Sequence, residues 1–379
     1  MIPPPSRRTV LGLLGAGALT GLGAAAGPAR AHDGTGSSPV VGLTGRHQAG
    51  IVTSPQRHLH FLAFDVTTSS RAQLARLLAD WTHVAASRSG GATRLSVTFG
   101  VGPGLFCGNG RDRFGLSGGR PAPLVALPRF TGDSLEPARA ASDIALQVCG
   151  DDWPTVRAAT RTLVAAAGDR ARLRWDQWGA RAPGPHPRNR FGFHDGTANI
   201  ALDDRAALDH HVWVSSGPRW MHGGTYLVVR RLRMDVEQWQ AETVDEQQRT
   251  IGRFKHTGAP LSGGDATSPV DLTATDPGGA LLEPPHCHVV VAHPDNNHGV
   301  RILRRGYTYD DGVGAFGRHD AGLFFCAFTR HPGRRFVPMQ QRLARFDALS
   351  RYVVGTASAV YAVPRGLSAS TTWADQILG

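Results

Sequence analysis

A short segment around Asp195, residues 191–199 with the sequence Phe-Gly-Phe-His-Asp-Gly-Thr-Ala-Asn, has residue types that could hold a flat ligand. Glycine has no side chain, so the glycines near Asp195 let the backbone approach such a ligand closely. Asp-Gly followed by Thr and Asn is also typical of an ordinary surface turn. The segment alone therefore leaves two interpretations open, a ligand-binding loop and a turn.

Histidines gather in a second segment, residues 286–294, with the sequence His-Cys-His-Val-Val-Val-Ala-His-Pro. Its valines predict a strand over 288–292. Alternate strand residues share a face, so His286, His288 and Val290 are expected to point the same way. A zinc site would need two or three more ligands, which nothing nearby supplies. A haem iron needs a single axial His, and ordinary histidines at a strand end are the remaining alternative.

Adjacent arginines mark a third segment, residues 301–310, where Arg304 and Arg305 stand among apolar and aromatic residues. Arginines that are buried require an anionic partner. The segment therefore predicts an anionic ligand if these side chains are buried, and an ordinary surface pair if they are exposed.

The overall composition is that of a globular protein, with 41% hydrophobic and 19% charged residues. The formal net charge is +11, but the arginines are scattered, which favours a basic surface over a nucleic-acid-binding stripe. The four cysteines form no CxxC pair, which excludes a zinc ribbon. Cys149, Cys287 and Cys326 lie in apolar runs typical of strands and are predicted to be buried thiols.

The first 31 residues have the pattern of an export signal. Arg7 and Arg8 form a twin-arginine pair, a Gly/Ala-rich apolar stretch follows over residues 10–26, and a small-residue cleavage pattern ends at Ala31. We expect a Tat signal peptide at 1–31, a flexible leader at 32–44, and an exported protein that is extracellular, periplasmic or cell-wall associated. A poor N-terminal anchor is the alternative. No other segment could span a membrane, so no stable membrane insertion is expected.

The spacing of apolar residues predicts the same order of elements twice, strand-helix-strand and then strand-helix-strand. In the first half the expected strands are 58–66, 94–102, 142–149 and 172–178, with helices at 70–87 and 153–167. In the second half they are 225–234, 288–292, 323–329 and 359–363, with helices at 236–252 and 338–353. This order predicts an α+β fold, a duplicated ferredoxin-like (βαββαβ) arrangement with two antiparallel sheets and peripheral helices. We expect an N-terminal domain at 45–215 and a C-terminal domain at 216–379.

Together the three segments resemble those of the dye-decolourising peroxidases, most closely the Tat-exported iron-porphyrin, or deferrochelatase-like, branch. Residues 192–196 fit the GxxDG motif of that family, residues 288–294 fit its HxRxAxP segment, and residues 303–309 fit its LRRGYxY segment. Flanking matches cover most of the chain that follows the export signal. One position departs from the pattern: Val290 stands where the family often has Arg, which affects a contact around the haem and not the axial ligand.

The resemblance implies that the chain binds one haem b, with His288 as the axial ligand of its iron and Asp347 as the candidate partner of the other ring nitrogen. Asp195 would be the distal proton shuttle. Arg304 would stabilise charge on the peroxide and contact a haem propionate. The match implies further haem contacts: Gly196, Thr197, Ala198, Arg253, His293, Pro294, Asp295, Leu323 and Phe325.

The activity implied is that of a peroxidase, which uses hydrogen peroxide to oxidise bulky aromatic or dye-type reductants by one-electron steps through a ferryl intermediate. Such reductants cannot enter a pocket shaped for peroxide, so their electrons would arrive through surface or near-surface aromatic residues. The candidates are Tyr226, Tyr307, Tyr309 and Trp220, and simple packing is the alternative for each.

Other activities stay open. Some relatives release iron from the porphyrin and keep the ring, and the sequence does not separate that activity from peroxidase activity. A non-catalytic haem or copper carrier is a further alternative, although Asp195 and Arg304 argue against it because a carrier needs no acid–base pair. Nucleic-acid binding would need interleaved aromatic and basic residues on an exposed sheet, which the sequence lacks. An oligomer is compatible with the sequence.

Overall fold

The computed structural model describes residues 42–379 except 90–93, 109, 185–186, 315–316 and 318. The expected signal peptide at 1–31, and most of the leader at 32–44, lie outside the described residues. No helix within the described part combines the length and apolar character needed to cross a membrane. The described residues belong to one compact unit, and the division into 45–215 and 216–379 stays a prediction.

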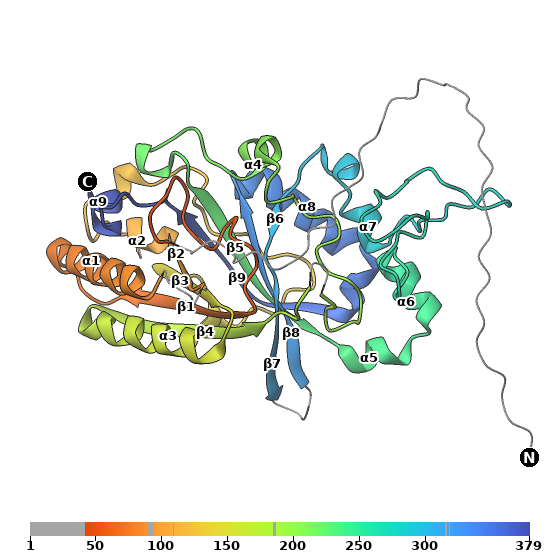
Figure 1. Ribbon diagram of the computed structural model, residues 1–379, viewed down its shortest axis with the longest axis horizontal. Helices are drawn as coiled ribbons and strands as arrows, with labels where there is room; N and C mark the ends of the chain where they lie inside the picture. Colours follow the sequence, from red (N-terminus) through yellow and green to blue (C-terminus); the bar gives the residue numbers. More distant parts are fainter. Residues whose placement is uncertain (1–41, 90–93, 109, 185–186, 315–316, 318) are drawn as a thin grey trace, which may run out of the picture. The chain divides into compact units, whose positions relative to one another are not determined.

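The first half of the chain forms four antiparallel strands in the order β2-β3-β1-β4. Its elements are β1 (His58–Val66), α1 (Arg71–Arg88), β2 (Ser96–Val101), α2 (Pro103–Phe106), β3 (Ile144–Gly150), α3 (Trp153–Ala167) and β4 (Ala171–Ala180). Ser70 caps α1 by accepting from Gln73 N, and Asp152 caps α3 by accepting from Thr155 N. The helices α1 and α3 lie side by side against these strands, as Figure 1 shows.

The second half contributes the remaining strands. Its elements are α4 (Arg205–His211), β5 (Thr225–Met234), α5 (Val236–Ala241), α6 (Val244–Ile251), α7 (His288–Val291), β6 (Leu303–Arg304), β7 (Tyr307–Val313), β8 (His319–Thr329), α8 (Pro332–Phe346), β9 (Val353–Val363) and α9 (Trp373–Leu378). Strand β5 pairs with β9 on one side and with β8 on the other, and β8 also pairs with β6 and β7. All of these pairings are antiparallel.

The two sets of strands join into one nine-stranded sheet instead of the two separate sheets expected from the sequence. At each junction between the two sets, one residue pair belongs to the ladder. Val101 of β2 pairs with Ala362 of β9, and Ala180 of β4 pairs with Thr308 of β7. The β5–β8 pairing closes the sheet into a barrel-like ring. Alternate residues of both halves fill the core between them; for example, the rings of Phe61 and Phe324 lie 5.1 Å apart.

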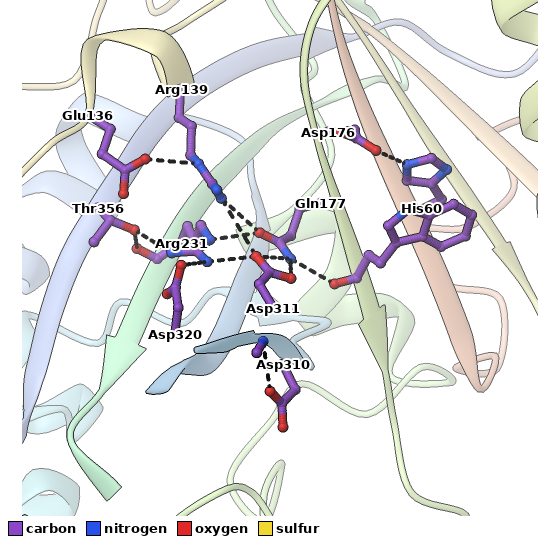
Figure 2. Close-up of polar contacts among 12 residues, drawn as sticks. His60, Glu136, Arg139, Asp176, Gln177, Arg231, Asp310, Asp311, Asp320 and Thr356 are labelled. Atoms are coloured by element: carbon purple, nitrogen blue, oxygen red, sulfur yellow. Dashed lines mark hydrogen bonds and ion pairs between the residues drawn. The ribbon is translucent and has the colours of Figure 1, made fainter. Parts of the chain in front are cut away.

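A fully buried arginine links several strands of this ring (Figure 2). Arg231 of β5 donates to Gln177 Oε1 of β4 at 2.7 Å and to Thr356 Oγ1 of β9 at 3.1 Å. The same guanidinium donates to Asp311 Oδ2 of β7 at 2.7 Å and to Asp320 Oδ2 of β8 at 2.8 Å. One side chain therefore links five strands that belong to both halves of the chain.

The expected strand at 288–292 is wrong, because His288–Val291 form the short helix α7. Cys287 O accepts from Val291 N and His288 O accepts from Ala292 N, which are the bonds of a helical turn. Asn297 Nδ2 donates a hydrogen bond to the carbonyl oxygen of Val291 at 2.9 Å. These contacts override the strand propensity of the valines. His286, His288 and Val290 therefore do not share one face of a strand, and β6 and β7 take the position of the expected strand.

Two helix boundaries also differ from the prediction. The helix expected at 236–252 is broken into α5 and α6, since Thr243 caps a new helix by accepting from Glu246 N. The helix expected at 338–353 begins earlier, at Pro332, and ends before Asp347. Cys149, Cys287 and Cys326 are buried free thiols as predicted, although Cys287 precedes a helix and does not lie in a strand.

Candidate active site

The loop that carries Asp195 is a tight, internally bonded turn. Asn189 Oδ1 accepts from Phe191 N at 3.0 Å and from Phe193 N at 3.2 Å. Gly192 and Gly196 have φ values of 82° and 77°, a region that favours glycine. Phe191 and Phe193 pack with Trp239 of α5, so the loop from the first half is anchored on the second half.

Arg304, the last residue of β6, is fixed directly against this loop. Asn199 Nδ2 donates to Arg304 O at 2.8 Å, and Arg304 N donates to Asn199 Oδ1 at 2.9 Å. Asn199 is a site residue that is not predicted from the sequence. Its signal is its position at the end of the quoted Asp-Gly segment, but the two residues are 105 positions apart, so the pairing is visible only in the fold.

The charges of Asp195 and Arg304 influence each other. Burial lowers the pKa of the half-buried Arg304 guanidinium, and the Asp195 carboxylate opposes that change. Within the described part of the chain, the guanidinium donates no hydrogen bond. Asp195 Oδ1 accepts from the N–H of Gly196 at 2.7 Å. Asp195 thus offers a proton acceptor, and Arg304 offers a cation that interacts with it electrostatically and has donors left for a ligand.

His288 is held by the carboxylate that the sequence suggested. Its Nδ1 lies 2.6 Å from Asp347 Oδ2, and Asp347 Oδ1 accepts from Leu349 N at 2.9 Å. The Asp347 side chain is only 5% exposed, whereas that of His288 is 40% exposed. A carboxylate at Nδ1 keeps the proton on that nitrogen and makes Nε2 a stronger electron donor. Nε2 is therefore the ring nitrogen of His288 that is left to bind a metal.

The neighbouring thiol does not compete with this histidine. Burial raises the pKa of Cys287 to about 12, so the thiol stays neutral, and only a thiolate is a good iron ligand. No group of three or more His, Cys, Asp or Glu residues in the described ranges could hold a bare metal ion. The donor set fits a metal that brings most of its own ligands, as a haem iron does.

Arg253 connects the two parts of the site. Its guanidinium donates to Gly258 O at 2.7 Å. Its positive charge is attracted by Glu283 and repelled by Arg304. The preceding Gly252 lies directly against α7, because a Cβ there would be 2.3 Å from Val289 Cγ2. The stretch 252–253 thus packs on the helix that carries His288 and lies near Arg304. Burial lowers the pKa of Arg253, and its buried Nε has no partner among the described residues.

The other predicted haem contacts are distributed around these residues. Leu323 and Phe325 lie on one face of β8 and are half-buried, while Phe324 between them is fully buried. Leu323 and Asp195 line one small pocket with Gly306 and Thr308. The remaining predicted contacts lie on two segments. Gly196, Thr197 and Ala198 follow Asp195 in its loop, and His293, Pro294 and Asp295 follow α7, where Pro294–Asn297 form a short 3-10 helix. Of these, His293 accepts from Asp295 N, and the Asp295 side chain is 79% exposed.

Three of the predicted electron-entry residues are not near the surface. Tyr226, Tyr307 and Tyr309 are 1–2% exposed, since each lies on a strand inside the packed sheet. Trp220 is half-buried and packs against Phe106. A bulky reductant could therefore contact Trp220 but none of the three tyrosines.

Comparison with known proteins places this site in a family. Residues 48–181 match the family model "Dyp-type peroxidase, N-terminal" and residues 186–368 match "Dyp-type peroxidase, C-terminal". The chain is 37% identical to a dye-decolorizing peroxidase of Thermobifida fusca (strain YX), over 95% of this chain and 94% of the relative. It is 33% identical to a deferrochelatase of Yersinia pseudotuberculosis serotype I (strain IP32953), over 92% and 89%. The structure of ferric DtpA from Streptomyces lividans matches with a TM-score of 0.85 and 35% identity, covering 90% of this chain and 98% of that one.

The chain belongs to the Dyp-type peroxidase family. It is an enzyme, a haem peroxidase, and haem is its cofactor. Hydrogen peroxide and organic reductants are accordingly its partners.

Proposed function

We propose that His288 binds the haem iron through Nε2, that Asp195 moves the proton of bound peroxide, and that Arg304 stabilises the charge that develops there. The observation that carries this proposal is the 2.6 Å contact between His288 Nδ1 and the buried Asp347 carboxylate, which leaves Nε2 as the donor. When bound, haem supplies an iron that peroxide oxidises by two electrons and that reductants restore one electron at a time.

Asp195 acts on the peroxide proton. Cleavage of the O–O bond requires a proton to pass from the inner oxygen to the outer one, and a carboxylate does this only if it is ionised at the start. The positive charge of Arg304 interacts favourably with the Asp195 carboxylate. Asp195 Oδ1 already accepts from Gly196 N, which holds the carboxylate in place. The other carboxylate oxygen then receives the proton and returns it to the leaving hydroxide as water forms.

Arg304 and its neighbours supply positive charge around the reaction. The guanidinium of Arg304 carries unused donors that can meet the leaving oxygen or a haem propionate. Arg253 adds a buried cation near the half-buried Arg304. Leu323 and Phe325 exclude water from the face on which Asp195 lies, which strengthens these electrostatic interactions.

The test is an absorption spectrum of the haem-loaded protein before and after one equivalent of hydrogen peroxide. In His288→Ala we expect the Soret band to be lost or shifted. In Asp195→Ala we expect the band to be intact and its peroxide-dependent change to be slower by about 10²–10⁴-fold, the usual contribution of a positioned acid–base group. A normal Soret band in His288→Ala would sink the ligand assignment, and an unchanged rate in Asp195→Ala would sink the proton shuttle.

Iron release is the second candidate, because a relative that is 33% identical over 92% of this chain is named a deferrochelatase. The two activities differ in their products. Anaerobic incubation of the loaded protein with an iron chelator would yield metal-free porphyrin if iron release occurs, and intact haem if it does not. We propose the peroxidase as the main activity, because a carboxylate and an arginine at the peroxide position serve O–O cleavage and are not needed to remove iron.

The proposal includes the origin of the fold and the route of export. The strand orders β4-β1-β3-β2 and β9-β5-β8-β7 are equivalent, which supports two ferredoxin-like units related by duplication. Arg7 and Arg8 support export by the twin-arginine pathway. Replacement of both arginines by lysine should leave the protein in the cytoplasm. Unchanged export of that variant would remove the twin-arginine assignment.

A further inference from the structure

A large pocket of about 1630 Å³ shares no lining residue with the haem-peroxidase site. Its lining comes from the first turn of α1, the loops at 115–119 and 213–223, the segment 365–368 after β9, and α9. Figure 1 shows α9 beside α1, and the two helices pack against each other. Pockets for drug-sized ligands are about 300–1,000 Å³. This pocket therefore has room for a ligand with more than one aromatic ring.

Arginines give the pocket a positive character. Four of them line it: Arg46, Arg71, Arg219 and Arg365. None of the four forms an ion pair with another described residue, and the Arg71 guanidinium donates only to the backbone carbonyls of Phe114 and Leu378. Two carboxylate side chains, Asp209 and Asp375, also line the pocket, and Asp375 is already engaged in capping α9. The guanidinium groups thus outnumber the carboxylate side chains, which favours an anionic ligand.

Aromatic rings form the apolar walls. Trp213 is stacked on His47, with ring centroids 3.6 Å apart and an interplanar angle of 8°. Trp220 packs parallel to Phe106 and donates from Nε1 to Gly119 O at 3.1 Å. Their stacking partners and the hydrogen bond of Trp220 fix these rings in the absence of a ligand. Little side-chain conformational entropy is therefore lost when a flat molecule packs against them.

The backbone around the pocket is also fixed. Gly45 N donates to Leu367 O at 2.9 Å and Gly366 N donates to Arg46 O at 3.2 Å, so the segments that carry Arg46 and Arg365 are joined. A Cβ at Gly366 would lie 2.2 Å from Gly45 O, which shows how closely these segments cross. The pocket is therefore largely preformed, as ligand sites usually are.

We propose that this pocket binds a planar aromatic anion, a carboxylate or a sulfonate, and that this anion is a reductant of the enzyme. Guanidinium groups pair with the acid group, as they do with planar anions in general, and the tryptophans pack against the ring. The inference rests on the proposed function. When the ring also carries a phenolic hydroxyl, two such molecules each give up one electron and the hydroxyl proton to form phenoxyl radicals, and together they reduce one peroxide to two waters. Trp213 lies in the same buried cluster as Leu303, the neighbour of Arg304, which connects the pocket with the haem site.

The direct test is calorimetric titration of the haem-loaded mature protein with 2-naphthalenesulfonate. The same ring with an ammonium group, 2-naphthylmethylamine, serves as the charge control. The double variant Arg219→Gln/Arg365→Gln changes two exposed pocket residues, and Arg161→Gln changes an exposed arginine of α3 outside the pocket. We expect the sulfonate to bind the wild type and Arg161→Gln equally, and the double variant at least about tenfold more weakly, the usual loss for charge-assisted hydrogen bonds.

A kinetic readout separates this pocket from the haem site. With an oxidisable naphthol sulfonate, the double variant should show a raised KM, an unchanged kcat and an unchanged Soret response to peroxide. Equal sulfonate affinity in the double variant and the wild type would overturn the pocket assignment, as would equal binding of the cationic control. Absence of any Soret response in the wild type would instead overturn the proposed function and leave the binding result standing.

Discussion

Asn199 forms two hydrogen bonds with the backbone of Arg304, one through its amide N–H to the carbonyl and one through its carbonyl to the N–H. This pairing fixes the loop of Asp195, which belongs to the first half of the chain, on strand β6 of the second half. The acid–base residue and the cation of the site therefore come from two halves joined at this point. The geometry of the site depends on a residue that needs no contact with the substrate.

Replacement of Asn199 by Ala should slow turnover and leave haem binding intact. Both hydrogen bonds are lost, so the Asp195 loop can shift relative to Arg304, and a misplacement of about 1 Å can cost about 10²-fold in rate. Stopped-flow measurement of the Soret change with peroxide would show this loss. Asn199→Asp keeps the acceptor for Arg304 N and loses only the donor to Arg304 O. The rate of its Soret change should therefore lie between that of the wild type and that of Asn199→Ala. Equal rates in wild type and Asn199→Ala would show that the pairing does not position the site.

Replacement of Asp347 by Asn should weaken His288 as an iron donor while the ligand stays in place. The amide keeps the size of the carboxylate and can still accept from Leu349 N, but it removes the negative charge at His288 Nδ1. Substitutions of this kind commonly cost about 10–100-fold in activity. We expect the Soret band to remain and the midpoint potential of the iron to rise in spectroelectrochemical titration. An unchanged potential would contradict the role assigned to the Asp347 charge.

The elements of the first half can be predicted from the sequence because periodicity and capping agree there. The helix after Ser70 and the helix after Asp152 have both an apolar face and a side-chain cap. The pattern fails at 288–292, where strand-forming valines are held in a helical turn by contacts with Gly252 and Asn297. His288 is therefore predicted correctly as a residue and wrongly as part of a strand. Residues such as Asn199 act through partners about a hundred positions away, which no local pattern shows.

Replacement of Arg231 by Met should destabilise the closed sheet. The guanidinium is fully buried and binds side chains from β4, β7, β8 and β9 (Figure 2). Its loss leaves Asp320 without its ion-pair partner among the described residues and removes one of the two arginines that pair with Asp311. Removing one member of such a pair costs on the order of 3 kcal/mol of unfolding free energy. Denaturant unfolding would measure it. The control is Arg174→Met, whose ion pair with Asp65 is partly exposed and should contribute less than about 1 kcal/mol.

The stability of the protein should fall on acidification, and His211 should contribute to that fall. Burial, with the positive charges of Arg335 and His210, lowers the pKa of His211 to about 4 from 6.5. His211 Nδ1 accepts from the Arg335 guanidinium at 2.7 Å, which requires the neutral ring. Between pH 6.5 and about 4 the unfolded chain therefore binds a proton that the native chain does not. The stabilisation is complete above pH 6.5 and declines toward pH 4.

The contribution of His211 is obtained by comparing how the melting temperatures of the wild type and of His211→Gln depend on pH. The melting temperature of His211→Gln should depend less steeply on pH between 4 and 6.5 than that of the wild type, while His83→Gln, an exposed histidine of α1, should follow the wild type. Parallel curves for wild type and His211→Gln would assign the pH dependence to other groups.

Replacement of Gly252 by Ala should reduce haem binding without touching any ligand. Gly252 has a φ of 87°, which a residue with a side chain adopts only with strain. An added Cβ would lie 2.3 Å from Val289 Cγ2 and 2.6 Å from Cys287 Sγ, so α7 must move and His288 must move with it. Haem titration of the apoprotein should give a weaker affinity and a shifted Soret band. Gly299→Ala is the matched control, because Gly299 also has a positive φ, 71°, but a Cβ there meets no atom within 4 Å. If both variants bind haem equally, strain alone explains the effect, and close packing at Gly252 does not position His288.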